Sequence, residues 1–446
     1  MYVSAGHGES AAARAPDVAS VTLRKVTLRL IPFLFLLYIV AWLDRVNVGF
    51  AALQMNSDLG FSSAAFGFGS GVFFLGYCLF EVPSNLVLHR VGARRWISRI
   101  MISWGAISVA MMFVRTTRPF YVLRFLLGAA EAGFFPGVVY YLSYWYPEGQ
   151  RARAIAAFMA AVPVSGVVGG PLSGALLSLN GLFGLAGWQW LFLVEGAPAI
   201  LLGVIVLVYL PDQPETADWL SSAEKEWLVS RLAAERTTCN GALRIGIFAA
   251  LTNSTIWHLG IIFLCTAIGF YGYSFWAPLV VKSLIGSSDL GVGVIIGAIS
   301  AVTIISMMLN GAHSDHTDER PLHVAVPLLI SGAGFFGCAV LRQPILAVFF
   351  LALVPIGHCA AYGPFWSMPS RFLTGAPAAA GIALVVTIAN VGGFVGPTII
   401  GAMKDRFGMY GPAFMVLGGC AIVAALLAIA LGRVPVLRSA PTSNLV

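Results

Sequence analysis

Apolar residues along this chain are gathered into long runs separated by short polar or charged breaks. Each run has about 20 residues or more, which is the length that an α-helix needs to cross about 30 Å of hydrocarbon. A membrane-spanning barrel would instead show segments of about 10 residues in which apolar and polar positions alternate. The sequence has no such alternation, so the pattern predicts an all-α membrane protein.

Twelve such runs divide evenly between the two halves of the chain. In the first half they lie near 28–52, 65–88, 97–114, 119–144, 153–178 and 188–210. In the second half they lie near 254–281, 291–311, 322–341, 344–366, 378–401 and 410–433. The expected organisation is a tail at 1–27, a six-helix bundle at 28–210, a central loop at 211–252, a second six-helix bundle at 253–433 and a tail at 434–446.

Composition indicates a lipid bilayer as the surroundings of most of the chain. Of the 446 residues, 59% are hydrophobic and only 10% are charged, and the mean hydropathy is +0.87. Soluble proteins carry roughly 25% charged residues. The net charge of +7 comes from basic residues at the ends of the runs and not from one patch, so we expect no nucleic-acid partner.

The distribution of lysine and arginine predicts the side of the membrane on which each loop lies. With the N-terminus inside, 18 of the 26 basic residues are cytoplasmic: Arg14, Arg24, Lys25, Arg29, Arg90, Arg94, Arg95, Arg99, Arg151, Arg153, Lys225, Arg231, Arg236, Arg244, Arg320, Arg371, Arg433 and Arg438. Six lie on the opposite side: Arg115, Arg118, Lys282, Arg342, Lys404 and Arg406. Because loops rich in basic residues stay in the cytoplasm, both termini are expected there.

The central loop contains the pattern of a short surface helix. Ser221 and Glu224 have the spacing of a capping box, and Trp227, Leu228 and Leu232 share one helical face. We therefore expect an amphipathic helix that lies on the cytoplasmic surface.

The two halves of the chain also resemble each other weakly. The stretch 131–137 in the fourth span has a counterpart in 360–366 of the tenth. A repeat of six plus six spans is typical of transporters whose two bundles rock about a central site, although channels and membrane enzymes can also have repeats.

Four ionisable residues fall deep inside the predicted spans, namely Asp44 and Arg45 in the first span and Arg124 and Glu131 in the fourth. A charge at such depth is unfavourable unless it meets water, protein or a partner, so each is a candidate for function. Adjacent helical residues point about 100° apart, so Asp44 and Arg45 should face different surroundings. Arg124 and Glu131 lie two turns apart on one face, well placed to hold partners from the first span.

The four charges, which sum to zero, suggest that the acidic side chains and an anionic substrate compete for arginine. A guanidinium stays protonated and binds a carboxylate through a two-pronged fork, so Arg45 is a candidate anchor for an anionic substrate. Protonation of Asp44 or Glu131 would release an arginine to the substrate and couple proton entry to anion entry. The alternative is that the four groups only join the first and fourth spans.

Other residues inside the spans could complete a substrate cavity with aromatic walls and hydrogen-bond donors. The candidates are Tyr38, Tyr77, Tyr271, Trp366 and Asn390, each of which could equally serve helix packing. Four further ionisable residues are interpreted as structural, with a proton relay as the alternative for the two histidines: Glu81, Glu195, His258 and His358.

Enzyme motifs are absent from the sequence. It has no P-loop, no HExxH and no cysteine and histidine cluster with metal-ligand spacing. We therefore expect no enzyme activity, no cofactor and no metal. The energy for transport should come from an ion gradient or from the solute itself.

Several motifs in combination resemble one family of transporters over residues 28–433. They are Tyr38-x5-Asp44-Arg45-x-Asn47-x3-Ala51, Phe80-Glu81-Val82-Pro83-Ser84-Asn85, Arg124-x6-Glu131-Ala132-Gly133-x2-Pro136-Gly137, Gly187-Trp188-Gln189-Trp190-Leu191-Phe192, and Pro211-Asp212-x-Pro214 with Trp219-Leu220. The chain resembles the anion:cation symporter family of the major facilitator superfamily, which includes bacterial tartrate, hexonate, phthalate and hydroxyphenylacetate carriers. It departs from the superfamily pattern after the second span, where Asn85 and His89 replace the usual glycine and acid.

The resemblance implies a fold of two pseudo-symmetric six-helix bundles and assigns roles to the candidate residues. It implies that Arg45 contacts the substrate carboxylate and that Asp44 and Glu131 exchange protons. It further implies a supporting role for Arg124 and positions in the cavity for Tyr77, Trp366 and Asn390.

The implied function is proton-coupled import of a small organic carboxylate across a bacterial inner membrane by a monomer. A tartrate-like hydroxy acid is favoured, followed by an aromatic carboxylate. An organic-anion exchanger or exporter would use the same charges, and a non-transporting membrane sensor would use the same fold, so both stay open as alternatives.

Overall fold

The computed structural model describes residues 18–237, 252–369 and 376–433. In this part of the chain, twelve helical segments are long and apolar enough to cross a membrane, which confirms the predicted number of spans. Most of the predicted tails lies outside the described residues, as do four of the basic residues assigned to the cytoplasm: Arg14, Arg244, Arg371 and Arg438.

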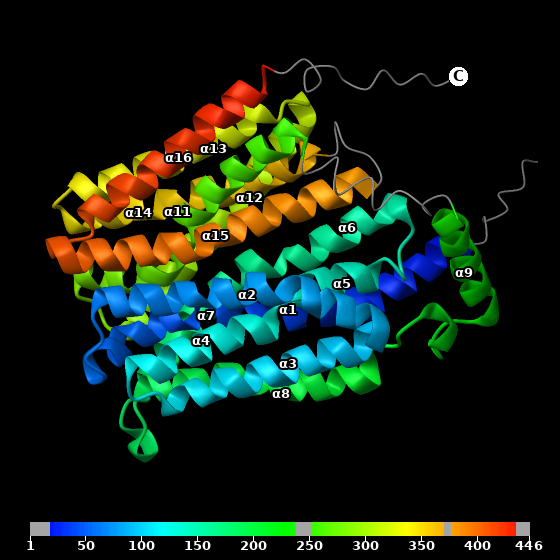
Figure 1. The fold of residues 1–446 in the computed structure, drawn as a ribbon, viewed down its shortest axis with the longest axis horizontal. Helices are drawn as coiled ribbons and strands as arrows, with labels where there is room; N and C mark the ends of the chain where they lie inside the picture. Colours follow the sequence, from blue (N-terminus) through cyan, green and yellow to red (C-terminus); the bar gives the residue numbers. More distant parts are fainter. Residues whose placement is uncertain (1–17, 238–251, 370–375, 434–446) are drawn as a thin grey trace, which may run out of the picture.

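The first half of the chain builds six spans. Its helices are α1 (Val18–Asp58), α2 (Ser63–Val91), α3 (Ala93–Ala110), α4 (Thr117–Glu131), α5 (Phe134–Leu142), α6 (Glu148–Met159), α7 (Ala161–Leu177) and α8 (Gly187–Tyr209). Two spans are interrupted, since α4 and α5 together form one span and α6 and α7 another. In Figure 1 these helices, coloured from blue to green, form the lower group.

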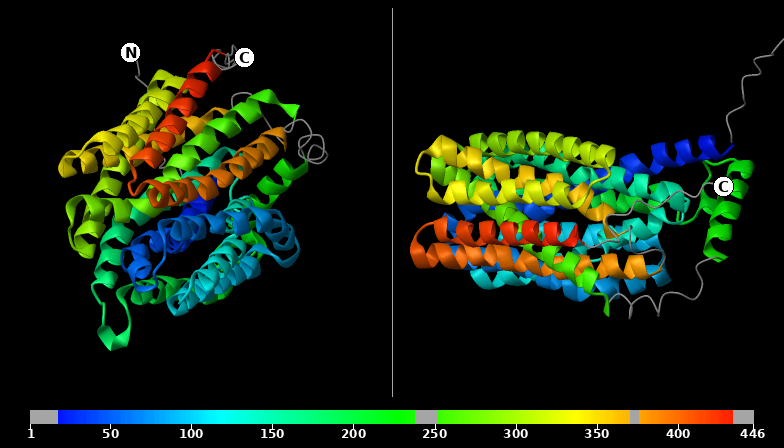
Figure 2. Two further views of the ribbon diagram at one scale, coloured as in Figure 1. Left: turned by 60° about the vertical axis from the view of Figure 1, so that its left-hand side comes forward. Right: turned by 90° about the horizontal axis from the view of Figure 1, so that it is seen from above.

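The second half builds the other six spans from one helix each. They are α11 (Ser254–Ile285), α12 (Asp289–Thr317), α13 (Pro321–Val340), α14 (Pro344–Ser367), α15 (Ala376–Phe407) and α16 (Gly411–Leu431). Figure 2 shows the two groups of helices side by side with their axes running in a common direction. The fold of two six-helix bundles is therefore as predicted.

Glycines allow the two bundles to approach closely. α2 packs against α15, and α7 packs against α12. A Cβ atom at Gly71 of α2 would lie 2.7 Å from the carbonyl oxygen of Phe394, and one at Gly170 of α7 would lie 2.5 Å from that of Gly293. Only glycine permits backbones this close, as is usual between membrane helices.

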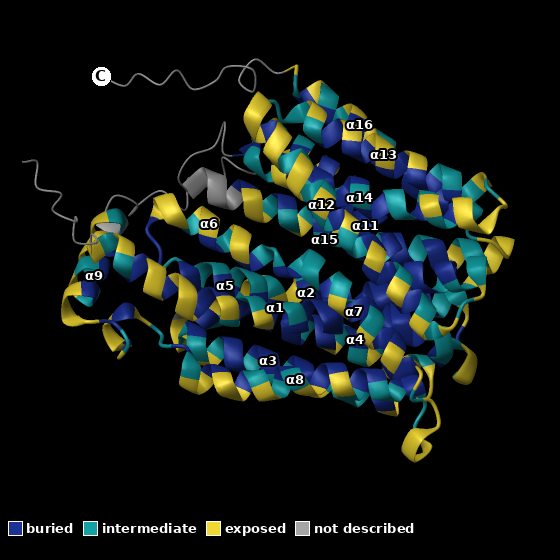
Figure 3. Ribbon diagram, turned by 180° about the vertical axis from the view of Figure 1, so that it is seen from behind, coloured by how far each residue is buried: buried dark blue, intermediate teal, exposed yellow. Residues whose placement is uncertain are grey.

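Polar contacts join the bundles at one end. Asp405 of α15 accepts hydrogen bonds from the backbone N–H groups of Ser63 at 2.9 Å and Ala64 at 2.8 Å, at the start of α2. The Nε2 atom of Gln54 donates to Oδ2 of Asp289 at 2.8 Å, which connects α1 to α12. Figure 3 shows many buried residues gathered toward this end.

The helix α9 (Ser222–Thr237) of the central loop lies across the other end of the molecule (Figure 1). The predicted capping box is present, because the N–H of Ser221 donates to Glu224 Oε2 at 2.8 Å and the N–H of Glu224 donates to Ser221 Oγ at 3.4 Å. Leu228 and Leu232 are buried, and Glu224 pairs with Lys25 of α1 at 2.7 Å. The helix therefore turns an apolar face inward, and its position on the cytoplasmic surface stays a prediction.

The start of the first helix and the continuity of the fourth span differ from the prediction. α1 begins at Val18 and not near 28, because the polar turns before the apolar run continue the same helix. The fourth span, predicted as continuous, breaks after Glu131, where Gly133 has a φ of +88°. Glycine adopts this left-handed conformation without a steric penalty. The break makes Glu131 the last residue of α4.

Candidate functional site

Arg45 of α1 and Glu131 of α4 form a buried ion pair. Nη2 of Arg45 donates to Oε1 of Glu131, and the two residues are 8% and 1% exposed. Removing one partner from a buried pair leaves the other charge without compensation. The pair should therefore separate only when a proton or another ion takes the place of one partner.

Aromatic residues surround the Arg45 guanidinium. Its carbon lies 5.0 Å from the ring centre of Trp42 and 5.4 Å from that of Tyr77, distances at which a cation is attracted to a ring. Tyr271 of α11 interacts with the guanidinium through its hydroxyl, and Tyr38 lies within its electrostatic reach. The predicted tyrosines Tyr38, Tyr77 and Tyr271 thus gather at Arg45, and Tyr271 comes from the opposite bundle. Sequence reasoning missed Trp42.

Arg124 of α4 is fully buried and bonded to the backbone of α2. Its Nε donates to the carbonyl oxygen of Gly69 at 3.3 Å and its Nη2 donates to that of Ser70 at 3.2 Å. Its Nη1 is buried without a hydrogen-bond partner among the described residues. Arg124 therefore fixes α2 against α4, and it does not form an ion pair with Glu131.

Asp44 faces a different side of α1 from Arg45. Its Oδ2 accepts from Trp104 Nε1 at 2.8 Å, and its Oδ1 accepts from Ser108 Oγ at 2.7 Å and from Asn47 Nδ2 at 3.3 Å. Protonation of Asp44 would not release an arginine in this structure, because among the described residues no arginine pairs with Asp44. The angle of about 100° between neighbouring helical residues explains the difference, because it directs Asp44 toward α3.

The position of Asp44 changes the charge balance around Arg45. Two guanidinium groups, those of Arg45 and Arg124, lie near one directly bonded carboxylate, that of Glu131. The half-buried Glu81 is a further acid within electrostatic reach of Arg45. Nε of Arg45 and Nη1 of Arg124 are both buried without partners in the described part of the chain. Because unsatisfied charged donors are unfavourable when buried, an anion that reached them would be stabilised.

Trp366 of α14 and Asn390 of α15, also predicted to line the cavity, come from the second bundle. The ring of Trp366 packs against Phe263 and Phe365, with centroids 5.0 Å and 5.2 Å away. Nδ2 of Asn390 is buried without a hydrogen-bond partner among the described residues. Ring contacts lead from Trp366 through Phe263, Tyr362 and Phe270 to Tyr271. The place of Trp366 and Asn390 in a cavity stays a prediction.

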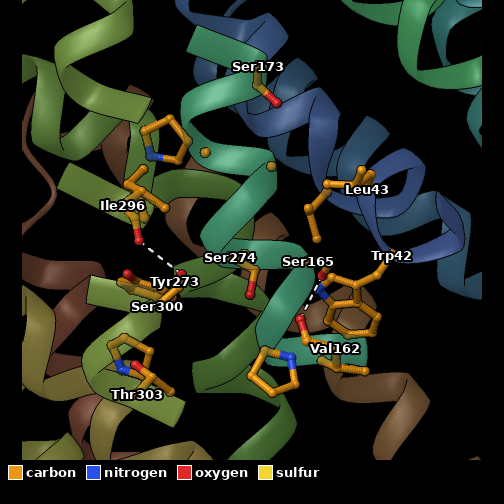
Figure 4. Close-up of a pocket in the computed structure, with 18 of the residues that line it drawn as sticks. Trp42, Leu43, Val162, Ser165, Ser173, Tyr273, Ser274, Ile296, Ser300 and Thr303 are labelled. Carbon is orange, nitrogen blue, oxygen red and sulfur yellow. Dashed lines mark hydrogen bonds between the residues drawn. The ribbon is translucent and has the colours of Figure 1, made fainter. Parts of the chain in front are cut away.

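A cavity of about 100 Å³ lies between the bundles, beside Trp42. Figure 4 shows hydroxyl-bearing side chains from α7, α11 and α12 around it. They are Ser165, Ser173, Tyr273, Ser274, Ser300 and Thr303. Sequence reasoning missed these residues, because a hydroxyl group in an apolar span bonds as readily to its own helix backbone as to a ligand.

The described residues do not form a recognisable metal site. They contain no group of three or more histidine, cysteine, aspartate or glutamate side chains that could hold a metal ion. The candidate site thus consists of the ion pair, the tyrosines around it and the neighbouring cavity.

Two bundles of six spans, with a buried ion pair inside the first, define this molecule as a multi-pass membrane protein. The family model of the Major Facilitator Superfamily matches residues 34–397. The chain therefore belongs to the Major Facilitator Superfamily.

Curated relatives cover nearly the whole chain. Two proteins of Agrobacterium vitis, each named "Putative tartrate transporter", are 48% and 49% identical over 417 residues, which make up 94% of this chain and 92% and 96% of theirs. The inner membrane transport protein RhmT of Escherichia coli (strain K12) is 37% identical over 408 residues, which cover 91% of this chain and 94% of that protein.

Solved structures share the fold. A bacterial homologue of the human lysosomal transporter Spinster, in an inward-facing and occupied conformation, superposes with a TM-score of 0.74 at 19% identity, over 91% of this chain and 96% of that one. Its similarity supports the arrangement of the helices in this chain.

Proposed function

We propose that this protein is a proton-coupled symporter that imports a small organic carboxylate. The observation that carries the proposal is the buried Arg45–Glu131 pair, next to donors on Arg45 and Arg124 that have no partner in the described chain. A tartrate-like hydroxy acid is the favoured substrate because two close relatives are named as tartrate transporters. An aromatic carboxylate is the next candidate.

Protonation of Glu131 is the proposed coupling step. A neutral Glu131 no longer balances the charge of Arg45, so the guanidinium becomes available to a substrate carboxylate as a two-pronged donor. The carboxylate would then lie between α1 and Tyr271 of α11, and would connect the two bundles. Return of the proton to the cytoplasm would restore the ion pair and release the substrate.

The proposed orientation places both termini and α9 in the cytoplasm and the spans in a bacterial inner membrane. The polar contacts of Asp405 and of Gln54 with Asp289 would then close the outer end of the site. The structure would correspond to an inward-facing state of a monomer, with residues 28–210 and 253–433 as the two moving bundles and 211–252 between them.

Uptake into proteoliposomes tests the proposal. Labelled tartrate and a panel of aromatic carboxylates would be offered with and without an inward proton gradient, and with an uncoupler. We expect one carboxylate to accumulate only with the gradient, and Arg45→Ala to abolish its uptake. Arg118→Ala is the control, because Arg118 is an exposed arginine at the start of α4. Accumulation that ignores the gradient would exclude symport, and exchange without net uptake would favour an exchanger.

A further inference from the structure

Glu195 of α8 is a buried acid that the proposed coupling step does not use. It is 3% exposed, and its Oε1 accepts a hydrogen bond from Ser173 Oγ of α7 at 2.7 Å. Its other oxygen, Oε2, is buried without a partner among the described residues. A carboxylate in such a position needs a donor that the structure does not supply.

Asn47 links Glu195 to Asp44. Its side chain interacts with both carboxyl groups, and its Nδ2 donates to Asp44 Oδ1 at 3.3 Å. The Oδ1 atom of Asn47 is also buried and without a partner in the described chain. Asn47 Oδ1 and Glu195 Oε2 are therefore two buried acceptors that both lack a donor. A proton on Glu195 Oε2 would turn that atom into a donor, so that it no longer needs a group that donates to it.

The charged groups around Glu195 also favour the protonated form of its carboxyl group. α8 packs against α1, α3 and α7. The charged group that acts on Glu195 is Asp44 of α1, another acid, while α3 contributes the neutral donors Trp104 and Ser108 to Asp44 and α7 contributes Ser173. Two carboxylates that share a buried site without a cation are strongly unfavourable when both are ionised.

A route to this acid pair begins at the cavity between the bundles. Ser173 lines that cavity, as Figure 4 shows at its upper end, and the same hydroxyl donates to Glu195. Polar groups therefore lead from the cavity through Ser173 to Glu195, and on through Asn47 to Asp44.

We propose that Glu195, together with Asp44 across Asn47, forms a second proton-binding site that is separate from the Arg45–Glu131 pair. In the state described here the proton is on Glu195 and Asp44 is ionised. Use of this proton during transport rests on the proposed function, whereas its binding does not.

Infrared difference spectroscopy of the reconstituted protein at neutral pH tests the proposal. The wild type should show the C=O band of a protonated carboxylic acid, and Glu195→Gln should remove it. Glutamine has nearly the size and shape of glutamate, and its oxygen can still accept from Ser173 Oγ, so this variant should fold. Glu131→Gln should leave the band in place, since Glu131 is paired with Arg45, and Asp44→Asn should shift its frequency.

The outcomes separate the two proposals. A wild type without the band, or a band that persists unchanged in Glu195→Gln, would overturn the second proton site. If Glu195→Gln did not fold, Ser173→Ala would replace it, and a band whose frequency this variant left unchanged would also overturn the site. Failure of every carboxylate to accumulate would instead refute the proposed function and would leave the infrared result untouched.

Discussion

The two faces of α1 present neighbouring charges to very different surroundings. On one face, Arg45 meets a carboxylate and aromatic rings in the region where the bundles approach each other. On the other face, Asp44 meets the neutral donors Trp104 and Ser108 inside the first bundle. Although the residues are adjacent in the sequence, Arg45 lies near the second bundle and Asp44 lies in the packing within the first bundle.

The comparison shows what each arrangement can respond to. An ion pair such as that of Arg45 and Glu131 can be opened by any anion that offers the arginine an equal charge. The neutral donors around Asp44 are already bonded to its carboxylate. Under the proposed function, a rotation of about 100° between adjacent residues would thus separate a site for substrate and proton from a site for protons.

The largest expected effect is that of Arg45→Ala. It should abolish carboxylate uptake and reduce the free energy of unfolding by about 3–5 kcal/mol, because Glu131 would remain buried without its partner. The double variant Arg45→Ala with Glu131→Ala should recover much of the stability but none of the uptake. Thermal unfolding in detergent and uptake into proteoliposomes measure the two effects. Recovery of uptake in the double variant would contradict the role of Arg45 as substrate anchor.

Glu131→Gln should separate exchange from accumulation. Its amide oxygen can still accept from Arg45, so the protein should fold, but the side chain can no longer carry a proton. We expect counterflow of labelled substrate to continue while accumulation driven by a proton gradient is lost. Glu226→Gln, at an exposed position on α9, is the matched control and should behave as the wild type. Gradient-driven accumulation by Glu131→Gln would exclude Glu131 as the coupling acid.

The sequence predicted the spans and the charged residues inside them, but it did not predict which neighbours each charged residue meets. The number of spans follows from hydropathy alone, and the different directions of Asp44 and Arg45 follow from helix geometry. Which neighbour each residue meets depends on packing between helices far apart in the sequence, such as α1 with α3 or α4. For the same reason the serines of the cavity and the link from Glu195 to Asp44 had no recognisable signal.

A smaller effect on stability is expected when a residue that bonds to Asp44 is changed. Trp104→Phe retains the ring but removes the N–H that donates to Asp44 at 2.8 Å. A hydrogen bond to a charged group contributes about 1.5–3 kcal/mol, so the free energy of unfolding should fall by about that amount. The substrate concentration at half-maximal uptake should stay unchanged because Trp104 lies away from Arg45. Trp190→Phe, which removes an exposed bond to the carbonyl of Leu182, should have a much smaller effect on stability.

The smallest effect on stability is expected for the ion pair between Lys25, near the start of α1, and Glu224 of α9. Hydrogen bonds from Lys25 and from the backbone of Ser221 hold the pKa of Glu224 below its ordinary value near 4.5. Because the pKa is lower in the folded state, this contribution to stability is complete above the ordinary value and is lost as the pH falls through the lowered one.

Solvent limits the strength of this second ion pair of α1. The Lys25 side chain is 47% exposed, so the pair should contribute less than about 1 kcal/mol. Glu224→Gln should therefore lower the unfolding temperature slightly at neutral pH and should remove the difference from wild type in acid. Glu226→Gln should leave the neutral value unchanged. A loss of stability as large as that of Arg45→Ala would contradict this prediction. It would mean that the stabilisation from the two ion pairs of α1 does not increase with their burial.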